Sequence, residues 1–321
     1  MPAPRWKRPA KLALKSAVAV LVLWYLGRHV ARTWRDLNAQ GESIQIAPAW
    51  IALAGGLYLA GLAACGMVYA RVLAAGSTPV GTAAAIRAYL ISHLGKYVPG
   101  KAMVVVMRVG LTTPYGARPA TAALATFYET LAMMAAGALA GALGFALGPR
   151  PIQWIPLGAS AGLAALLLAV VEPKVFPRVA ALMTMPFPNV GPDALPSLSY
   201  RLLGTGLLWS LAGWVLLGLS QLAVVRGVSS AGIDLALWPV VIASVALATV
   251  AGFVVAVMPG GLGVREGVLM ATLAPAVGHD RAVVSALALR LTWVAAEVIA
   301  GGLLALARPS GRLAPAGVTE P

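Results

Sequence analysis

The chain has 321 residues, of which 60% are hydrophobic and 11% are charged, and its formal net charge is +14 at pH 7. A soluble domain has about 25% charged residues, so this composition excludes a soluble fold of this length. The basic residues are dispersed near the ends of apolar runs, which excludes nucleic acid as a partner and indicates contacts with anionic lipid headgroups. We predict an all-α, polytopic transmembrane helical bundle in the cell inner (plasma) membrane.

The N-terminal residues combine a basic segment with an apolar run, as a signal peptide does. Arg5, Lys7 and Arg8 precede the run, but no convincing small-x-small cleavage site lies ahead of Arg28. We therefore expect an uncleaved first helix and a cytoplasmic N-terminus. The predicted organisation is a basic cytoplasmic segment at 1–11, a transmembrane domain at 12–308 and a disordered tail at 309–321.

Apolar runs of the length that crosses a bilayer as a helix, about 20 residues, recur along the chain. The predicted full spans are 12–31, 48–73, 119–147, 152–171, 202–225 and 281–307. The connection at 172–201 contains six prolines, so we predict a loop without helix there.

Two further apolar regions, 82–113 and 235–278, are each interrupted by a Pro-Gly pair. A break in a membrane-embedded segment exposes backbone polar groups, which must be buried in protein or line a cavity. Paired interruptions in the two halves of a chain point to a transporter site built on internal repeats. We predict two re-entrant or broken helices related by an inverted repeat. The residues predicted to form the backbone turns are Pro99, Gly100, Pro259, Gly260, Gly261 and Gly263.

Charged residues inside the apolar regions are the candidates for a functional site, because charges at membrane depth are costly. Two interpretations stay open: the side chains pair to hold helices together, or they line a polar path for an anionic headgroup. Arg290 and Glu297, seven residues apart, are expected on one face of a helix. The candidate headgroup-binding residues are Lys96, Lys101, Arg108, Glu129, Arg265, Glu266, Arg290 and Glu297.

Residues 95–101 fit the first seven positions of the phosphate-binding loop G-x-x-x-x-G-K, but Ala102 stands where Ser or Thr would hold Mg²⁺. Nucleotide binding is therefore not expected. A turn with two lysines is a reasonable place for a lipid phosphate; alternatively, Lys96 and Lys101 mark a membrane interface. The single cysteine, Cys65, excludes a multi-cysteine metal site. We predict no metal site, no cofactor and no catalytic residue.

The lysine-rich Pro-Gly turn, Arg108 and the segment Pro259-Gly260-Gly261-Leu262-Gly263-Val264-Arg265-Glu266 together resemble the lysylphosphatidylglycerol synthase transmembrane region family. The resemblance covers most of the chain. It implies a flippase-like membrane protein that moves or binds a phospholipid, an aminoacylated phosphatidylglycerol or a polyprenyl-phosphate-linked lipid. In the multiple peptide resistance factors a soluble domain synthesises the aminoacylated lipid. These 321 residues do not include that domain, so we expect no synthase activity.

Two other functions stay open beside lipid translocation. The chain is then either a membrane partner subunit of a soluble synthase or glycosyltransferase, or a membrane-embedded transferase that modifies lipids. The transferase would need a catalytic acid–base group or a metal-binding acidic pair such as Asp-x-x-Asp, and the sequence contains no such pair. The expected partner is a membrane lipid that is anionic or contains phosphate.

Overall fold

The computed structural model describes residues 28, 47–97, 102–185, 194–228, 234–255 and 263–307. Within these ranges the regular elements are all helical, as predicted. The α-helices are α2 (Pro48–Ala75), α3 (Thr82–Ser92), α4 (Ala102–Thr112), α5 (Pro119–Leu147), α6 (Trp154–Val171), α7 (Phe176–Thr184), α8 (Tyr200–Gly227), α9 (Trp238–Val255), α10 (Val264–Val277) and α11 (His279–Leu306). Short 3-10 helices are η1 (His93–Tyr97), η2 (Thr113–Tyr115) and η4 (Leu235–Leu237).

Six segments in the described ranges are long and apolar enough to cross a membrane. They are Pro48–Ala75, Pro119–Leu147, Trp154–Val171, Tyr200–Gly227, Leu235–Val255 and His279–Leu306. Five of them correspond to predicted spans, which confirms a polytopic bundle. The other predicted span, 12–31, lies outside the described residues except for Arg28.

The sequence predicts that the region 235–278 is a broken segment that contains no full membrane span. The structure differs from this prediction in the first part of the region. Its first part, Leu235–Val255, has 21 residues and is long enough to cross the membrane. The shorter helix α10 follows after the interruption. Re-entrant geometry and an inverted repeat stay predictions.

The prediction of a loop without helix at 172–201 is wrong for α7. Pro177 lies in the first turn of that helix, where the missing N–H and the fixed φ of proline are tolerated. Glu172, just before it, accepts hydrogen bonds from the backbone N–H groups of Lys174 and Val175 at 2.8 and 2.9 Å. The Tyr200 hydroxyl also donates to Glu172 and lowers the pKa of this carboxyl. One acidic side chain therefore links the residues before α7 to the first residue of α8.

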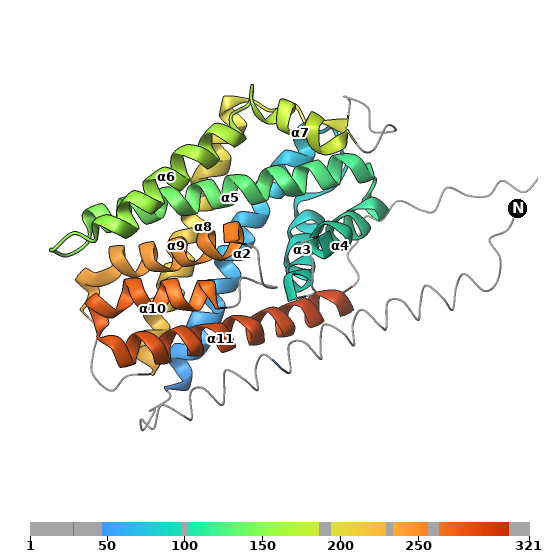
Figure 1. The fold of residues 1–321 in the computed structure, drawn as a ribbon. Helices are drawn as coiled ribbons and strands as arrows, with labels where there is room; N and C mark the ends of the chain where they lie inside the picture. Colours follow the sequence, from blue (N-terminus) through green and yellow to red (C-terminus); the bar gives the residue numbers. More distant parts are fainter. Residues whose placement is uncertain are drawn as a thin grey trace, which may run out of the picture.

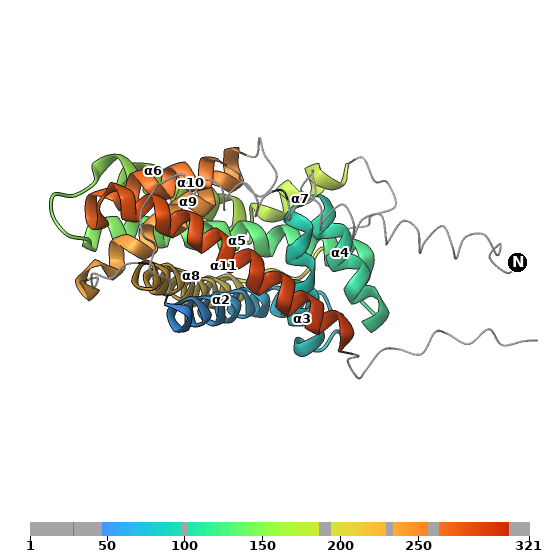
Figure 2. The same ribbon diagram turned by 90° about the horizontal axis from the view of Figure 1, so that it is seen from below.

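Helix α11 contacts the elements that flank both interruptions. In Figure 1, α3 and α4 lie on one side of the bundle and α9 and α10 lie on the other, while α11 runs below both groups. Seen from below, α11 extends from beside α10 to beside α3 (Figure 2). It contacts η1 and α3 as well as α10, and it also packs on α2 and α8. Side chains from the two halves of the chain can therefore meet on α11.

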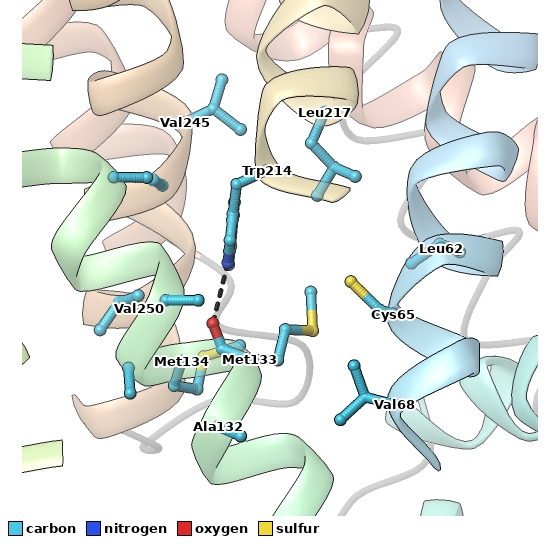
Figure 3. Close-up of a cluster of buried hydrophobic side chains, with 14 of the residues drawn as sticks. Leu62, Cys65, Val68, Ala132, Met133, Met134, Trp214, Leu217, Val245 and Val250 are labelled. Atoms are coloured by element: carbon cyan, nitrogen blue, oxygen red, sulfur yellow. Dashed lines mark hydrogen bonds between the residues drawn. The ribbon is translucent and has the colours of Figure 1, made fainter. Parts of the chain in front are cut away.

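Trp214 of α8 lies inside the bundle, and its side chain is fully buried. Its ring lies among side chains from α2, α5 and α9, including Leu62 and Val250 (Figure 3). The indole N–H donates to the carbonyl oxygen of Met133 at 2.8 Å. On the facing helix, a Cβ added to Gly137 would come within 2.6 Å of the indole. Only glycine at this position lets α5 approach the ring so closely.

Replacing Trp214 by phenylalanine is expected to lower the free energy of unfolding by roughly 1–3 kcal/mol, because a buried hydrogen bond is lost and a void remains. Thermal unfolding in detergent measures the change. Trp209→Phe is the matched control, because Trp209 lies on the same helix and is 36% exposed. Equal melting temperatures for both variants would contradict the importance of the Trp214 contact.

Candidate functional site

The structure divides the predicted charged residues into two groups. Arg108 and Glu129 form a pair between α4 and α5. The second group, the α11 cluster, consists of Lys96, Arg265, Glu266, Arg290 and Glu297. Other predicted site residues lie outside the described ranges: Pro99, Gly100, Lys101, Pro259, Gly260 and Gly261.

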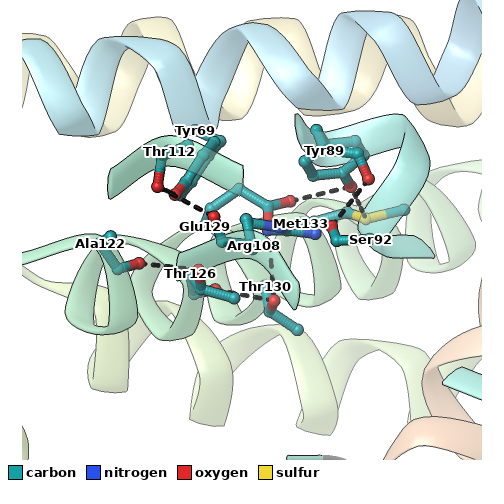
Figure 4. A network of polar contacts seen from close by, with 10 residues as sticks. All are labelled: Tyr69, Tyr89, Ser92, Arg108, Thr112, Ala122, Thr126, Glu129, Thr130 and Met133. Carbon is teal, nitrogen blue, oxygen red and sulfur yellow. Dashed lines mark hydrogen bonds and ion pairs between the residues drawn. The ribbon is translucent and has the colours of Figure 1, made fainter. Parts of the chain in front are cut away.

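The Arg108 side chain is held by neighbours from three helices (Figure 4). Its Nη1 donates to Oε2 of Glu129 at 2.8 Å, and its Nε donates to the Ser92 hydroxyl at 3.0 Å. The guanidinium carbon lies 4.9 Å from the ring centroid of Tyr69 and 4.2 Å from that of Tyr89. These cation–π contacts are strong when they are removed from water. Arg108 of α4 therefore contacts α2, α3 and α5.

Both carboxylate oxygens of Glu129 are used within this pair. Oε2 accepts from Arg108, and Oε1 accepts from the Tyr89 hydroxyl at 3.1 Å. Arg108 is 2% exposed and Glu129 is 1% exposed. A buried ion pair whose carboxylate is fully hydrogen-bonded is a packing element rather than an open site. The geometry favours the pairing interpretation for these two residues.

In the α11 cluster, Lys96 of η1 pairs with Glu297 of α11. The Tyr58 hydroxyl of α2 donates to the same carboxylate oxygen, and Lys96 Nζ lies 3.3 Å from that hydroxyl. The Lys96 side chain is 23% exposed, whereas that of Glu297 is 1% exposed. The contact joins the residues just before the first interruption to the last membrane helix.

The first turn of α10 brings a second ion pair to α11. Gly263, the N-cap, has a φ of 83°, in the left-handed region that favours glycine. Glu266 accepts from the Gly263 backbone N–H at 2.8 Å with one oxygen and pairs with Arg290 through the other. A carboxylate three residues after the N-cap stabilises a helix start. The predicted turn residue Gly263 thus positions the charged start of α10.

Arg265 of α10 is held differently from the other cations of the α11 cluster. Its guanidinium carbon lies 4.3 Å from the ring centroid of Trp293. Trp293 in turn stacks on Tyr58, with centroids 4.2 Å apart. Among the described residues, no carboxylate lies within the 4.0 Å of an ion pair with Arg265. Among these residues, the guanidinium of Arg265 therefore forms no ion pair with a carboxylate.

The cluster follows one face of α11. Arg290, Trp293 and Glu297 are separated by three and four residues, the spacing of neighbours on a helix surface. The sequence predicted Arg290 and Glu297 on one face, but sequence reasoning missed Trp293 and Tyr58. The spacing of Trp293 between two charged residues was an available signal. No sequence signal marks Tyr58, because it lies in an apolar run and its contact is with Glu297, which is distant in sequence.

Comparison with known proteins places the chain's sequence among membrane proteins. The family model described as Lysylphosphatidylglycerol synthase TM region matches residues 12–301. No curated protein matches the chain. The matched range includes every residue of the Arg108–Glu129 pair and of the α11 cluster.

Proposed function

This chain belongs to the lysylphosphatidylglycerol synthase TM region family, and we propose that it binds a phosphate-headgroup lipid at the α11 cluster and moves it between leaflets. In this proposal it lies in the inner membrane with a cytoplasmic N-terminus, and it transports the lipid without modifying it. The observation that carries the proposal is the meeting of charges from both interrupted regions on α11.

The charge of the α11 cluster supports an anionic ligand. The cluster contains three cations, Lys96, Arg265 and Arg290, against the two carboxylates of Glu266 and Glu297, which leaves a formal charge of +1. Two of the cations are already paired with these acids. The remaining guanidinium, Arg265, presents the planar fork of donors that matches phosphate oxygens.

A lipid bound in this way would keep its acyl chains in the bilayer while the headgroup contacts the cluster. The driving force would then come from the lipid gradient, from coupled ions or from the membrane potential. One charge that crosses 100 mV changes in free energy by about 2.3 kcal/mol. For a lipid with one negative charge, the potential alone thus suffices to bias the direction of transport.

Transport of labelled phospholipid between the leaflets of proteoliposomes tests the proposal. The wild-type chain should exceed protein-free vesicles, and Arg265→Gln should lower the rate by about 10- to 100-fold, the effect of losing a charged hydrogen bond of about 1.5–3 kcal/mol. Arg71→Gln is the matched control, because Arg71 also lies over a tryptophan ring, that of Trp209, away from the cluster.

Two outcomes would contradict the proposal. Rates equal to those of protein-free vesicles for anionic, zwitterionic and polyprenyl-phosphate lipids would exclude translocation and favour a partner subunit. Recovery of a chemically altered lipid would instead indicate a transferase. Mass analysis of the lipids after the assay distinguishes the two.

A further inference from the structure

His93 lies between the two groups of charged residues. It begins η1, three residues before Lys96, and side chains three residues apart on a 3-10 helix lie above one another. On its other side the imidazole stacks on the ring of Tyr89, with centroids 5.7 Å apart. The Tyr89 hydroxyl donates to Glu129, and the guanidinium of Arg108 lies over the Tyr89 ring. One imidazole thus adjoins both the Arg108–Glu129 pair and the α11 cluster.

The charges that act on this imidazole are positive. They belong to three residues on three different elements: Lys96 of η1, Arg108 of α4 and Arg265 of α10. The acids of the two groups, Glu129, Glu266 and Glu297, all form ion pairs with other residues. From α3, the neighbouring group is the phenol of Tyr89. Nearby cations disfavour a charged imidazole, so the surroundings in the ligand-free chain keep His93 neutral.

An anion bound among these cations changes the electrostatic balance at His93. Its negative charge offsets the positive charges around the imidazole and makes protonation easier. The coupling is reciprocal, so a proton on His93 strengthens the binding of the anion by the same factor. The imidazole is half-buried, whereas Arg108 and Glu129 are buried, so it is not sealed inside the bundle.

We propose that His93 takes up one proton when the anionic lipid binds, so that the lipid and a proton cross the membrane together. The proton comes from the water on the side where the lipid binds and is released to the water on the other side. This inference rests on the proposed function, because it assumes an anionic ligand at the α11 cluster.

Proton uptake at His93 also names the coupled ion. A lipid with one negative charge and its proton together carry no net charge, so the membrane potential does no work on the pair. A difference in pH across the membrane then supplies the driving force. The alternative is that His93 only packs against Tyr89 and never changes its charge.

The pH dependence of lipid binding tests the inference on the unmodified protein. Phosphatidylglycerol is the probe, because its phosphodiester keeps one negative charge between about pH 5.5 and about pH 8, the range in which histidine titrates. It is titrated into the chain in phosphatidylcholine nanodiscs, and bound lipid is measured by native mass spectrometry. If the bound anion returns His93 to the ordinary pKa of about 6.5, binding is about tenfold tighter at about pH 5.5 than at about pH 8. Equal affinity at both pH values overturns the inference.

Two histidine variants assign the pH dependence to one residue. His93→Gln should remove it, because glutamine does not titrate. His279→Gln is the matched control, since His279 is exposed at the start of α11, and it should keep the tenfold ratio. A ratio that persists in His93→Gln overturns the role of His93.

Transport by the unmodified chain separates this inference from the proposed function. In proteoliposomes, a pH difference should move labelled phosphatidylglycerol toward the leaflet that faces the alkaline side, whereas potassium diffusion potentials of either sign should leave the rate unchanged. Transport that responds to the potential and not to pH would overturn proton coupling but leave translocation intact. Transport no faster than in protein-free vesicles would show that the proposed function itself is wrong.

Discussion

Arg108→Ala is expected to lower the free energy of unfolding by about 3–5 kcal/mol, since it leaves the partner carboxylate charged and unpaired inside the bundle. Glu129 is 1% exposed and receives its closest hydrogen bond from Arg108. The substitution also removes the cation that lies over Tyr69 and Tyr89. Thermal unfolding in detergent and the yield of monodisperse protein measure the loss.

The control for this prediction removes the whole pair. In Arg108→Met/Glu129→Leu no charge remains buried, and replacing a buried ion pair by apolar residues of similar volume is often neutral. The double variant should therefore melt close to the wild type and transport lipid at a similar rate. A double variant that folds but has lost transport would instead place the pair in the lipid path.

Gly144→Ala is expected to destabilise the chain by about 2–3 kcal/mol, because the added methyl overpacks the contact between α5 and α9. The new Cβ would lie 2.4 Å from the carbonyl oxygen of Pro239 and 2.8 Å from the Cβ of Ala243. The first of these is a backbone atom and cannot rotate away. Relief requires that the two helices separate along their contact.

The same substitution at Gly162 of α6 should have the opposite sign. A Cβ there meets nothing within 4 Å, and alanine is the better helix former by about 0.8–1.0 kcal/mol. Gly144→Ala should lower the melting temperature and Gly162→Ala should leave it unchanged or raise it. Shifts in the same direction would show that the crowding at Gly144 is relieved elsewhere.

The length and composition of the apolar runs were sufficient to predict the fold class and five of the membrane-length segments. The errors come from proline and from the interruption. Pro177 was counted against helix, yet the first turn of α7 accommodates it. The Pro259 interruption led to the prediction that the whole region is broken. The uninterrupted apolar residues before it, Leu235–Val255, are nevertheless long enough to span the membrane. In both cases the position of proline within the segment mattered more than its presence.

The charged residues of both groups were predictable from the sequence, but their partition was not. Lys96 and Glu297 are 201 residues apart, and Arg108 and Glu129 are 21 apart. No local pattern states which cation meets which acid, because the choice depends on how α11 crosses the bundle. The meeting of Lys96 and Tyr58 at one oxygen of Glu297 likewise depends on contacts between residues distant in sequence.

Gly278 alone separates α10 from α11, with a φ of 90° that suits a sharp reversal. Glu266 and Arg290, which form an ion pair, each lie 12 residues from that glycine (278 − 266 and 290 − 278). Helix α10 is therefore joined to α11 at both of its own ends, by the turn at Gly278 and by the Glu266–Arg290 ion pair. Arg265 lies in the first turn of α10, beside Glu266, so the same ion pair sets its position against α11. The ion pair of Lys96 on η1 with Glu297 is a separate contact, and it joins α11 to the first half of the chain.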